Sequence, residues 1–346
     1  MRRAAYGFDD RVNTIGGQPP ETRHEYASYG TCPMLVTPVI DRRNQLRALG
    51  MAGLVAVAAS VVTLGLVGLP RENPWGIVAL SCGLGVVGGA WTYSLSRRKC
   101  LRRLELMNRP FPPEWEEILA TRVAFYAALN AAEKDRFRKL VQIFLAEVRV
   151  TGIRTEIDDT IRLLVAASAV IPIFGFRDWD YHRLGEVLVY PDAFNDQYQT
   201  DAHDRHILGL TGRASLSGVM ILSKPALLEG YNGDYGKENV GIHEFAHLVE
   251  QEAESHGLPP EVPHDTVRQW IAFVARELAD PKHNRAHMNR YGYTNEHEFF
   301  AVLTEYFFKS PDILQHHDPA LYDMLREIFH QDPASLFGHS HRSPSH

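Results

Sequence analysis

His243-Glu244-Phe245-Ala246-His247 is the stretch of sequence that decides the fold of this chain. Residues four apart on a helix lie one above the other, so both imidazoles face the same way and can share one zinc ion. Glu244 follows the first histidine and can reach a water on that zinc without being a ligand itself. The pattern is typical of zinc peptidases, in which this glutamate acts as the general base.

The residues around the motif predict a largely buried helix. Asn239 is a suitable N-cap, and Gly257 with Pro259-Pro260 provides the stop. Apolar side chains occupy most positions between them, at Val240, Ile242, Phe245, Ala246, Leu248 and Val249. The alternative interpretation is a buried core helix that carries two histidines by chance.

The third metal ligand must come from another part of the chain. A metzincin has Gly three residues and His six residues after the second histidine of the motif, where this chain has Glu250 and Ala253, so that class is excluded. A carboxylate from a second helix is the remaining common solution.

The segment 291–302 offers such a carboxylate. A Thr-Asn pair opens an apolar helix here, and Glu298 lies in its first turn. Position N3 of a helix is also the place of a capping-box glutamate, so Glu298 has a purely structural interpretation. Glu296 and Glu305 are rival ligands, and spacing alone leaves the choice among the three open.

Two blocks of the chain, 242–247 and 291–301, together resemble the Mlc titration factor A family of bacterial zinc peptidases. The second block also resembles the protease domain of anthrax lethal factor. Further matching blocks follow in the family's order at 111–115, 144–147, 188–194, 221–223, 228–230, 305–308 and 331–333. The resemblance covers residues 105–337.

This resemblance implies an α+β, zincin-like metallopeptidase domain, mainly helical with a small sheet, that holds one Zn²⁺ per chain. The implied zinc ligands are His243, His247 and Glu298, with Glu244 as the general base. Tyr291 would donate its phenol hydrogen to the oxyanion of the tetrahedral intermediate. Bound zinc lowers the pKa of its water to about 7, which makes hydroxide available at neutral pH.

Two neighbouring features each keep two interpretations. Glu250 lies on the ligand face of the motif helix, where it either orients an imidazole or belongs to a solvated acidic run. The apolar segment 218–223 predicts a strand. By resemblance to similar peptidases it is the edge strand that pairs with an extended substrate, and the equal alternative is a buried core strand.

Two apolar stretches near the start of the chain predict a transmembrane hairpin over residues 46–96. Leu46–Leu69 contains Arg47 as its one charge and Trp75–Leu95 contains none, and each approaches the roughly 20 residues that span a bilayer. The connection 70–74 is short enough for a tight turn. The lipid bilayer is therefore an expected partner.

Positive charges predict the orientation of this hairpin. Arginines and lysines flank both spans on the outer ends, whereas the turn has Arg71 alone. The positive-inside rule then places both termini and the peptidase domain in the cytoplasm, at the inner membrane. The net charge of −6 argues against nucleic-acid binding, and the basic cluster after residue 96 fits anionic headgroups.

The expected organisation has four parts: a flexible tail at 1–45, two transmembrane helices at 46–96, a zinc peptidase domain at 105–338 and a tail at 339–346. Helical periodicity covers 114–130, 132–149 and 158–169, and short strands are predicted at 186–190 and 219–223.

The favoured function is a membrane-tethered, cytoplasm-facing zinc peptidase acting on a peptide or protein substrate. The alternative is a regulatory binding protein that sequesters a transcriptional repressor or other regulator, because the resembling family implies such a partner. An intramembrane protease is disfavoured, since the motif lies some 150 residues after the spans in a polar context.

Overall fold

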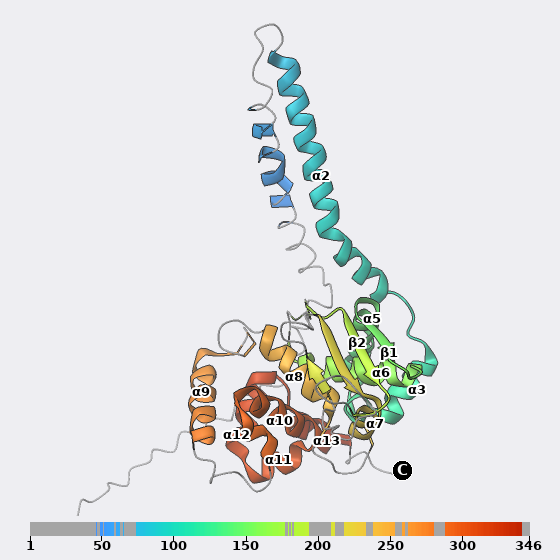
Figure 1. Ribbon diagram of the computed structural model, residues 1–346, viewed down its shortest axis with the longest axis vertical. Coiled ribbons are helices and arrows are strands. Elements are labelled where there is room, and N and C mark those ends of the chain that lie inside the picture. Colours follow the sequence, from blue (N-terminus) through green and yellow to red (C-terminus); the bar gives the residue numbers. More distant parts are fainter. Residues whose placement is uncertain are drawn as a thin grey trace, which may run out of the picture. The chain divides into compact units, whose positions relative to one another are not determined.

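The computed structural model describes most of the chain after residue 73 and short pieces before it (Figure 1). The described residues are 46, 49–50, 52–58, 60–62, 65, 74–176, 179, 181, 183–193, 209–211, 218–232, 238–252, 258–259, 262–279 and 288–340. The predicted tail 1–45, the turn 70–73 and the chain end 341–346 lie outside them.

The first strand is preceded by α2 (Pro74–Met107), α3 (Pro113–Arg122), α4 (Ala124–Ala128) and α5 (Ala131–Glu147), and it is followed by α6 (Asp159–Ile173). The helix predicted over 114–130 is broken, because the buried Val123 adopts an extended backbone conformation between α3 and α4. Helix α5 begins one residue before the predicted 132–149, since Asn130 and Glu133 form a capping box around its first turn, and it ends two residues earlier than predicted.

The described strands form one four-stranded sheet in the order β1-β2-β4-β3. They are β1 (Arg149–Gly152), β2 (Glu186–Tyr190), β3 (Gly209–Thr211) and β4 (Val219–Ser223). Strands β1, β2 and β4 are parallel, and β3 runs antiparallel to β4. The strands predicted at 186–190 and 219–223 are confirmed, whereas the edge-strand interpretation of 218–223 is wrong, because β4 lies inside the sheet and β3 is at its edge.

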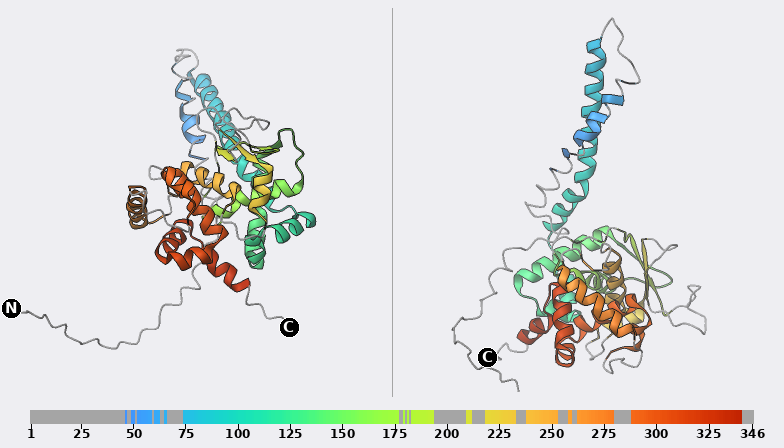
Figure 2. Two further views of the ribbon diagram at one scale, coloured as in Figure 1. Left: turned by 60° about the horizontal axis from the view of Figure 1, so that its bottom comes forward. Right: turned by 90° about the vertical axis from the view of Figure 1, so that its left-hand side faces the viewer.

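The remaining helices follow the sheet in sequence, and those from α10 onward, drawn in red tones, lie close together (Figure 2). The remaining helices are α7 (Lys224–Gly230), α8 (Val240–Glu252), α9 (His264–Ala279), the 3₁₀ helix η4 (Arg290–Thr294), α10 (Glu296–Lys309), α11 (Pro311–His317), α12 (Pro319–Phe329) and α13 (Pro333–Ser340). Helix α8 contacts β3 and β4 as well as α6 and α10, so it lies at the centre of the fold. A mainly helical α+β architecture with a small sheet is thereby confirmed.

Aromatic side chains fill the core on both sides of α8. Phe245 packs against Phe144 of α5 with ring centroids 5.6 Å apart, and Phe307 of α10 packs against Tyr322 and Phe329 of α12. All five of these side chains are fully buried. Burial of a side chain of this size contributes about 1.5–3 kcal/mol, so these contacts fix the position of α8 firmly.

The end of α2 is attached to the end of α5 by charged groups. Arg103 donates two hydrogen bonds to the Glu147 carboxylate, at 2.7 and 2.6 Å, and Lys99 lies 3.6 Å from the same group. Arg102 donates to the carbonyl of Ala146. These three members of the basic cluster therefore contact α5, and the predicted contact of the cluster with lipid headgroups stays a prediction.

No helix within the described parts of the chain combines the length and apolar content that a membrane crossing requires. The predicted transmembrane hairpin at 46–96 is not confirmed.

Gly241 is required for the close contact between α8 and α6. A Cβ atom at this position would lie 2.8 Å from Ser168 Cβ and closer still to Ser168 Oγ. Ser168 cannot turn away without losing its hydrogen bonds to the Leu164 carbonyl and the Tyr231 hydroxyl. We expect Gly241→Ala to lower the free energy of unfolding by about 1–3 kcal/mol in urea titrations, as overpacking usually does.

Gly338 supplies the matched control for this substitution. It is also helical and has open space at its Cβ position, so Gly338→Ala should leave the protein equally or slightly more stable. Equal effects of the two substitutions would contradict the tight contact between α6 and α8.

Candidate metal centre

Helix α8 presents both motif histidines on the side away from Phe245. The predicted N-cap is confirmed, since the Ile242 N–H donates to Asn239 Oδ1 at 3.0 Å. The Asn239 amide also donates to the Gly230 carbonyl at the end of α7. The His243 and His247 rings lie with centroids 4.9 Å apart, as expected for residues one helical turn apart.

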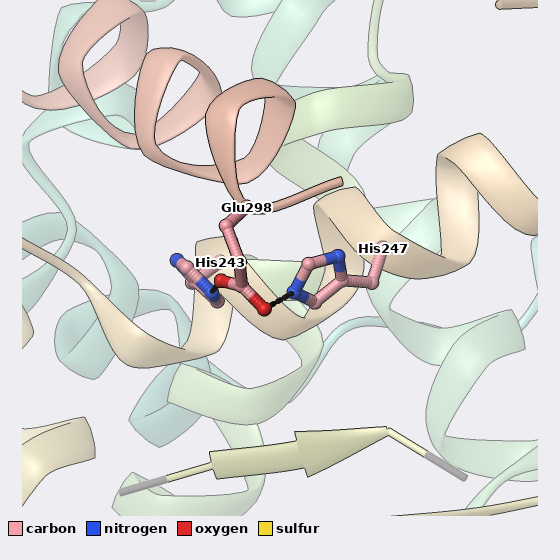
Figure 3. Close-up of side chains that lie close together, drawn as sticks. All are labelled: His243, His247 and Glu298. Atoms are coloured by element: carbon pink, nitrogen blue, oxygen red, sulfur yellow. Dashed lines mark hydrogen bonds and ion pairs between the residues drawn. The ribbon is translucent and has the colours of Figure 1, made fainter. Parts of the chain in front are cut away.

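Glu298 of α10 reaches both imidazoles from the facing helix (Figure 3). Its Oε2 lies 3.1 Å from His243 Nε2, and its Oε1 lies 3.6 Å from His247 Nε2. One ligand atom from each of the three residues lies within 4.8 Å of the others, so together they could hold a metal ion. Two imidazole nitrogens and one carboxylate oxygen match the donors of catalytic zinc sites, and leave room for a fourth ligand.

The two rival carboxylates, Glu296 and Glu305, lie outside this group of three possible metal ligands. Glu296 is largely exposed at the start of α10, where Asn295 caps the helix by accepting the N–H groups of His297 and Glu298. Glu305 lies two turns further along α10 and contacts the other nitrogen of His243, with Oε1 2.5 Å from Nδ1. Glu305 also accepts the backbone N–H of Asn239 at 2.6 Å.

Glu305 thus fixes the orientation of the His243 ring, a role that sequence reasoning had considered for Glu250. A carboxylate on Nδ1 holds the imidazole in the tautomer that exposes Nε2 to a metal, and it increases the basicity of that nitrogen. Glu250 lies 2.9 Å from Nδ1 of His297, and this contact joins the end of α8 to the start of α10.

The two carboxylates determine the protonation of His243. Burial lowers its pKa, but the hydrogen bonds with Glu298 and Glu305 outweigh burial and raise the pKa to about 10. Burial raises the pKa of Glu298, yet its interactions with the two histidines hold it below the usual value. Burial also raises the pKa of Glu305, so without metal a proton is held between His243 and this carboxyl group at neutral pH.

Glu244 is buried beside the cluster, with 5% of its surface exposed, and packs under the edge strand. A Cβ atom on Gly209 of β3 would lie 2.5 Å from Glu244 Oε1, so a glycine lets the strand pass directly over the carboxylate. The sequence had offered no signal for this strand, which is three residues long.

Tyr291 reaches the cluster from η4. Its ring centroid lies 6.2 Å from that of His243, and 55% of the residue is exposed. Partial burial and the charges of Glu298 and Glu244 raise the pKa of the phenol. The hydroxyl therefore remains protonated at neutral pH and can donate a hydrogen bond. All five residues singled out in the sequence are brought together.

Replacing Glu305 tests its role behind His243. We expect Glu305→Gln to weaken metal binding by about 10–100-fold, because the imidazole loses its charged acceptor while the ligands stay in place. Titration with Zn²⁺ and a competing chelator measures this change. Glu296→Gln, on the same helix but exposed, should bind the metal like the wild type. Unchanged affinity in Glu305→Gln would contradict the assignment.

Metal affinity should also depend on pH. A metal ion at Nε2 must displace the proton of His243, so each ion bound below about pH 10 should release about one proton. Affinity then rises about tenfold per pH unit below about pH 7, the pKa of zinc-bound water, which releases a further proton above it. Calorimetry in buffers of different ionisation enthalpy measures the released protons, and a value near zero would show that His243 is already neutral.

Comparison with known proteins agrees with this geometry. Residues 96–330 match the family described as glucose-regulated metallo-peptidase M90. An uncharacterized protein of Synechocystis is 31% identical over 274 residues, which are 74% of this chain and 97% of the relative.

Two relatives carry the name Mlc titration factor A. The protein of Enterobacter is 27% identical over 236 residues, covering 63% of this chain and 86% of the relative. The protein of Escherichia coli is 24% identical over 248 residues, covering 67% and 91%. The match spans more than half of the chain and includes all residues of the candidate centre, so this chain belongs to the glucose-regulated metallo-peptidase family M90.

Proposed function

We propose that the protein is a zinc-dependent peptidase that hydrolyses peptide bonds with Glu244 as the general base. The observation that carries this proposal is the convergence of His243, His247 and Glu298 beside the buried carboxyl group of Glu244. The donor set fits zinc, with His243, His247 and Glu298 as the ligands. When bound, zinc supplies a water acidified to a pKa of about 7.

The residues around the zinc ligands carry the remaining chemistry. Glu244 accepts the proton of the attacking water and returns it to the leaving amine. The Tyr291 phenol donates a hydrogen bond to the carbonyl oxygen as negative charge develops on it, an interaction that is stronger in the transition state than in the ground state. Glu305 keeps the His243 ring in place throughout.

The substrate is proposed to bind as an extended peptide along β3. This strand is at the edge of the sheet, antiparallel to β4, and its Gly209 lies against Glu244. A peptide that pairs with the outer side of β3 would run past the general base with its backbone hydrogen-bonded to the strand.

Hydrolysis of a peptide library by the zinc-loaded full chain tests the proposal. We expect Glu244→Gln to lower turnover at least about 10²-fold, because an amide cannot accept the proton of water, while one zinc per chain remains bound. Glu296→Gln is the control and should retain wild-type turnover. A peptidase activity that Glu244→Gln leaves intact would contradict the mechanism.

A second candidate function is the binding of a transcriptional regulator. It is favoured by two relatives that carry the name Mlc titration factor A. The match covers 86% of one relative and 91% of the other. Glu244→Gln separates the two functions, because sequestration of a partner needs a docking surface and no hydrolysis. A partner that co-purifies with Glu244→Gln in the same amount as with the wild type would support this candidate.

We further propose that residues 46–96 tether the protein to the inner membrane, with the peptidase on the cytoplasmic side. The close contact of small residues between the two apolar segments supports this proposal. A Cβ atom on Gly89 would lie 2.9 Å from the Ala52 carbonyl. Large apolar side chains face outward instead, among them Leu54, Val86 and Val87, each more than 65% exposed. Such a distribution suits a lipid surrounding rather than water.

Membrane flotation of the full chain tests the tether. The wild type should float with inner-membrane vesicles at high salt, and its C-terminus should be accessible only in inverted vesicles. Val86→Glu with Val87→Glu should shift the protein to the soluble fraction, because each buried charge costs about 2.5–3.5 kcal/mol at the centre of a span. Ile271→Glu, at an exposed apolar position of α9, is the control. A wild type that stays in the soluble fraction would sink the proposal.

A further inference from the structure

Tyr291 lies on a short and exposed element. The 3₁₀ helix η4 has five residues, and of these Gly292 alone is buried. A phenol that must meet a developing charge needs a fixed position, since a displacement of about 1 Å can cost 10²-fold in rate. The position of Tyr291 therefore depends on how η4 is attached to the rest of the fold. Gly292 of η4 packs on Val302, and Tyr293 packs on Phe299.

Asn289 adds an attachment with both ends of its side-chain amide. Its Oδ1 accepts the backbone N–H of Tyr291 at 3.0 Å, which caps η4. Its Nδ2 donates to Oε1 of Glu238 at 2.8 Å, across 51 residues of sequence. An ordinary cap needs only the first of these bonds.

The acceptor Glu238 is exposed, but its neighbour in the chain is fixed close to the metal centre. Glu238 directly precedes Asn239, whose side chain caps α8 and whose backbone N–H donates to Glu305. The same network thus fixes His243 and the residue to which Asn289 is bonded. The hydrogen bond from Asn289 to Glu238 therefore fixes the position of η4 relative to α8, the helix that carries His243 and His247.

We infer that Asn289 is a positioning residue for the Tyr291 phenol, acting through its hydrogen bond to Glu238. The inference rests on the proposed peptidase function for its kinetic part. It assigns to Asn289 and Glu238 a role in turnover, although neither side chain belongs to the metal-binding cluster.

The hydrogen bond between Asn289 and Glu238 can be broken and restored without removing the cap that residue 289 provides for η4. Asn289→Asp keeps an acceptor for the Tyr291 N–H, because Asp caps helices as well as Asn does, but it places a second carboxylate against Glu238. Adding Glu238→Gln to Asn289→Asp restores one donor and one acceptor in reversed order. Glu238→Gln alone retains an acceptor and measures the effect of the lost charge, and Glu296→Gln at an exposed position of α10 is the control.

Two measurements on the zinc-loaded full chain test the inference. Amide hydrogen exchange at Tyr291 should become about tenfold faster in Asn289→Asp and return toward the wild-type rate in the double variant. The kcat should fall by about 10–100-fold with little change in KM or zinc content, and the double variant should recover most of it, because loss of a complete oxyanion donor costs about 10²–10³. In a Tyr291→Phe background, Asn289→Asp should have no further effect on kcat.

Each contrary result has a separate meaning. Unchanged exchange in Asn289→Asp would overturn the attachment of η4 through Glu238, whether or not the protein hydrolyses peptides. Faster exchange with unchanged kcat in an active enzyme would overturn the positioning role. An equal loss of kcat in the Tyr291→Phe background would show that Asn289 acts through another group. Absence of hydrolysis by the wild type and by every control would count against the peptidase function, while the exchange result would still decide the attachment.

Discussion

Two carboxylates of α10, Glu298 and Glu305, lie on opposite nitrogens of the His243 imidazole, an arrangement that requires one fixed register of α8 against α10. Charged groups that are this buried are costly unless they are paired and hydrogen-bonded. The aromatic side chains of α10 hold its backbone in the core, and the caps at Asn239 and Asn295 fix where each helix begins. The position of the candidate metal centre thus follows from the packing of two helices rather than from a loop.

Sequence reasoning located the main parts of this centre because its signals are local. Two histidines four residues apart define one face of α8, and an Asn cap followed by an apolar run defines α10. Strands β2 and β4 were also predicted with their observed bounds, since each is a continuous apolar run between turn residues. Strands β1 and β3 were not predicted, because three or four residues carry too little periodicity to be distinguished from a loop.

The division of roles among the glutamates could not be predicted from spacing: the resemblance implied Glu298 as the ligand, and no sequence signal indicated Glu305 as the partner of His243 Nδ1. Glu298 and Glu305 are seven residues apart, which places them on the same face of α10 two turns from each other. Which of them meets Nε2 and which meets Nδ1 depends on how far α10 is shifted along α8, a property of tertiary packing. The role of Glu250 depends on tertiary packing as well. Its position on α8 suits an imidazole partner, and that partner is His297 of α10.

The measurement that tests the central claim most directly is a crystal structure of the zinc-loaded protein with anomalous diffraction at the zinc edge. We predict one strong peak, about 2.0–2.2 Å from Nε2 of His243, Nε2 of His247 and a carboxylate oxygen of Glu298, with Glu305 still on Nδ1 of His243. A peak at another place, or one coordinated by Glu305 in place of Glu298, would contradict the account.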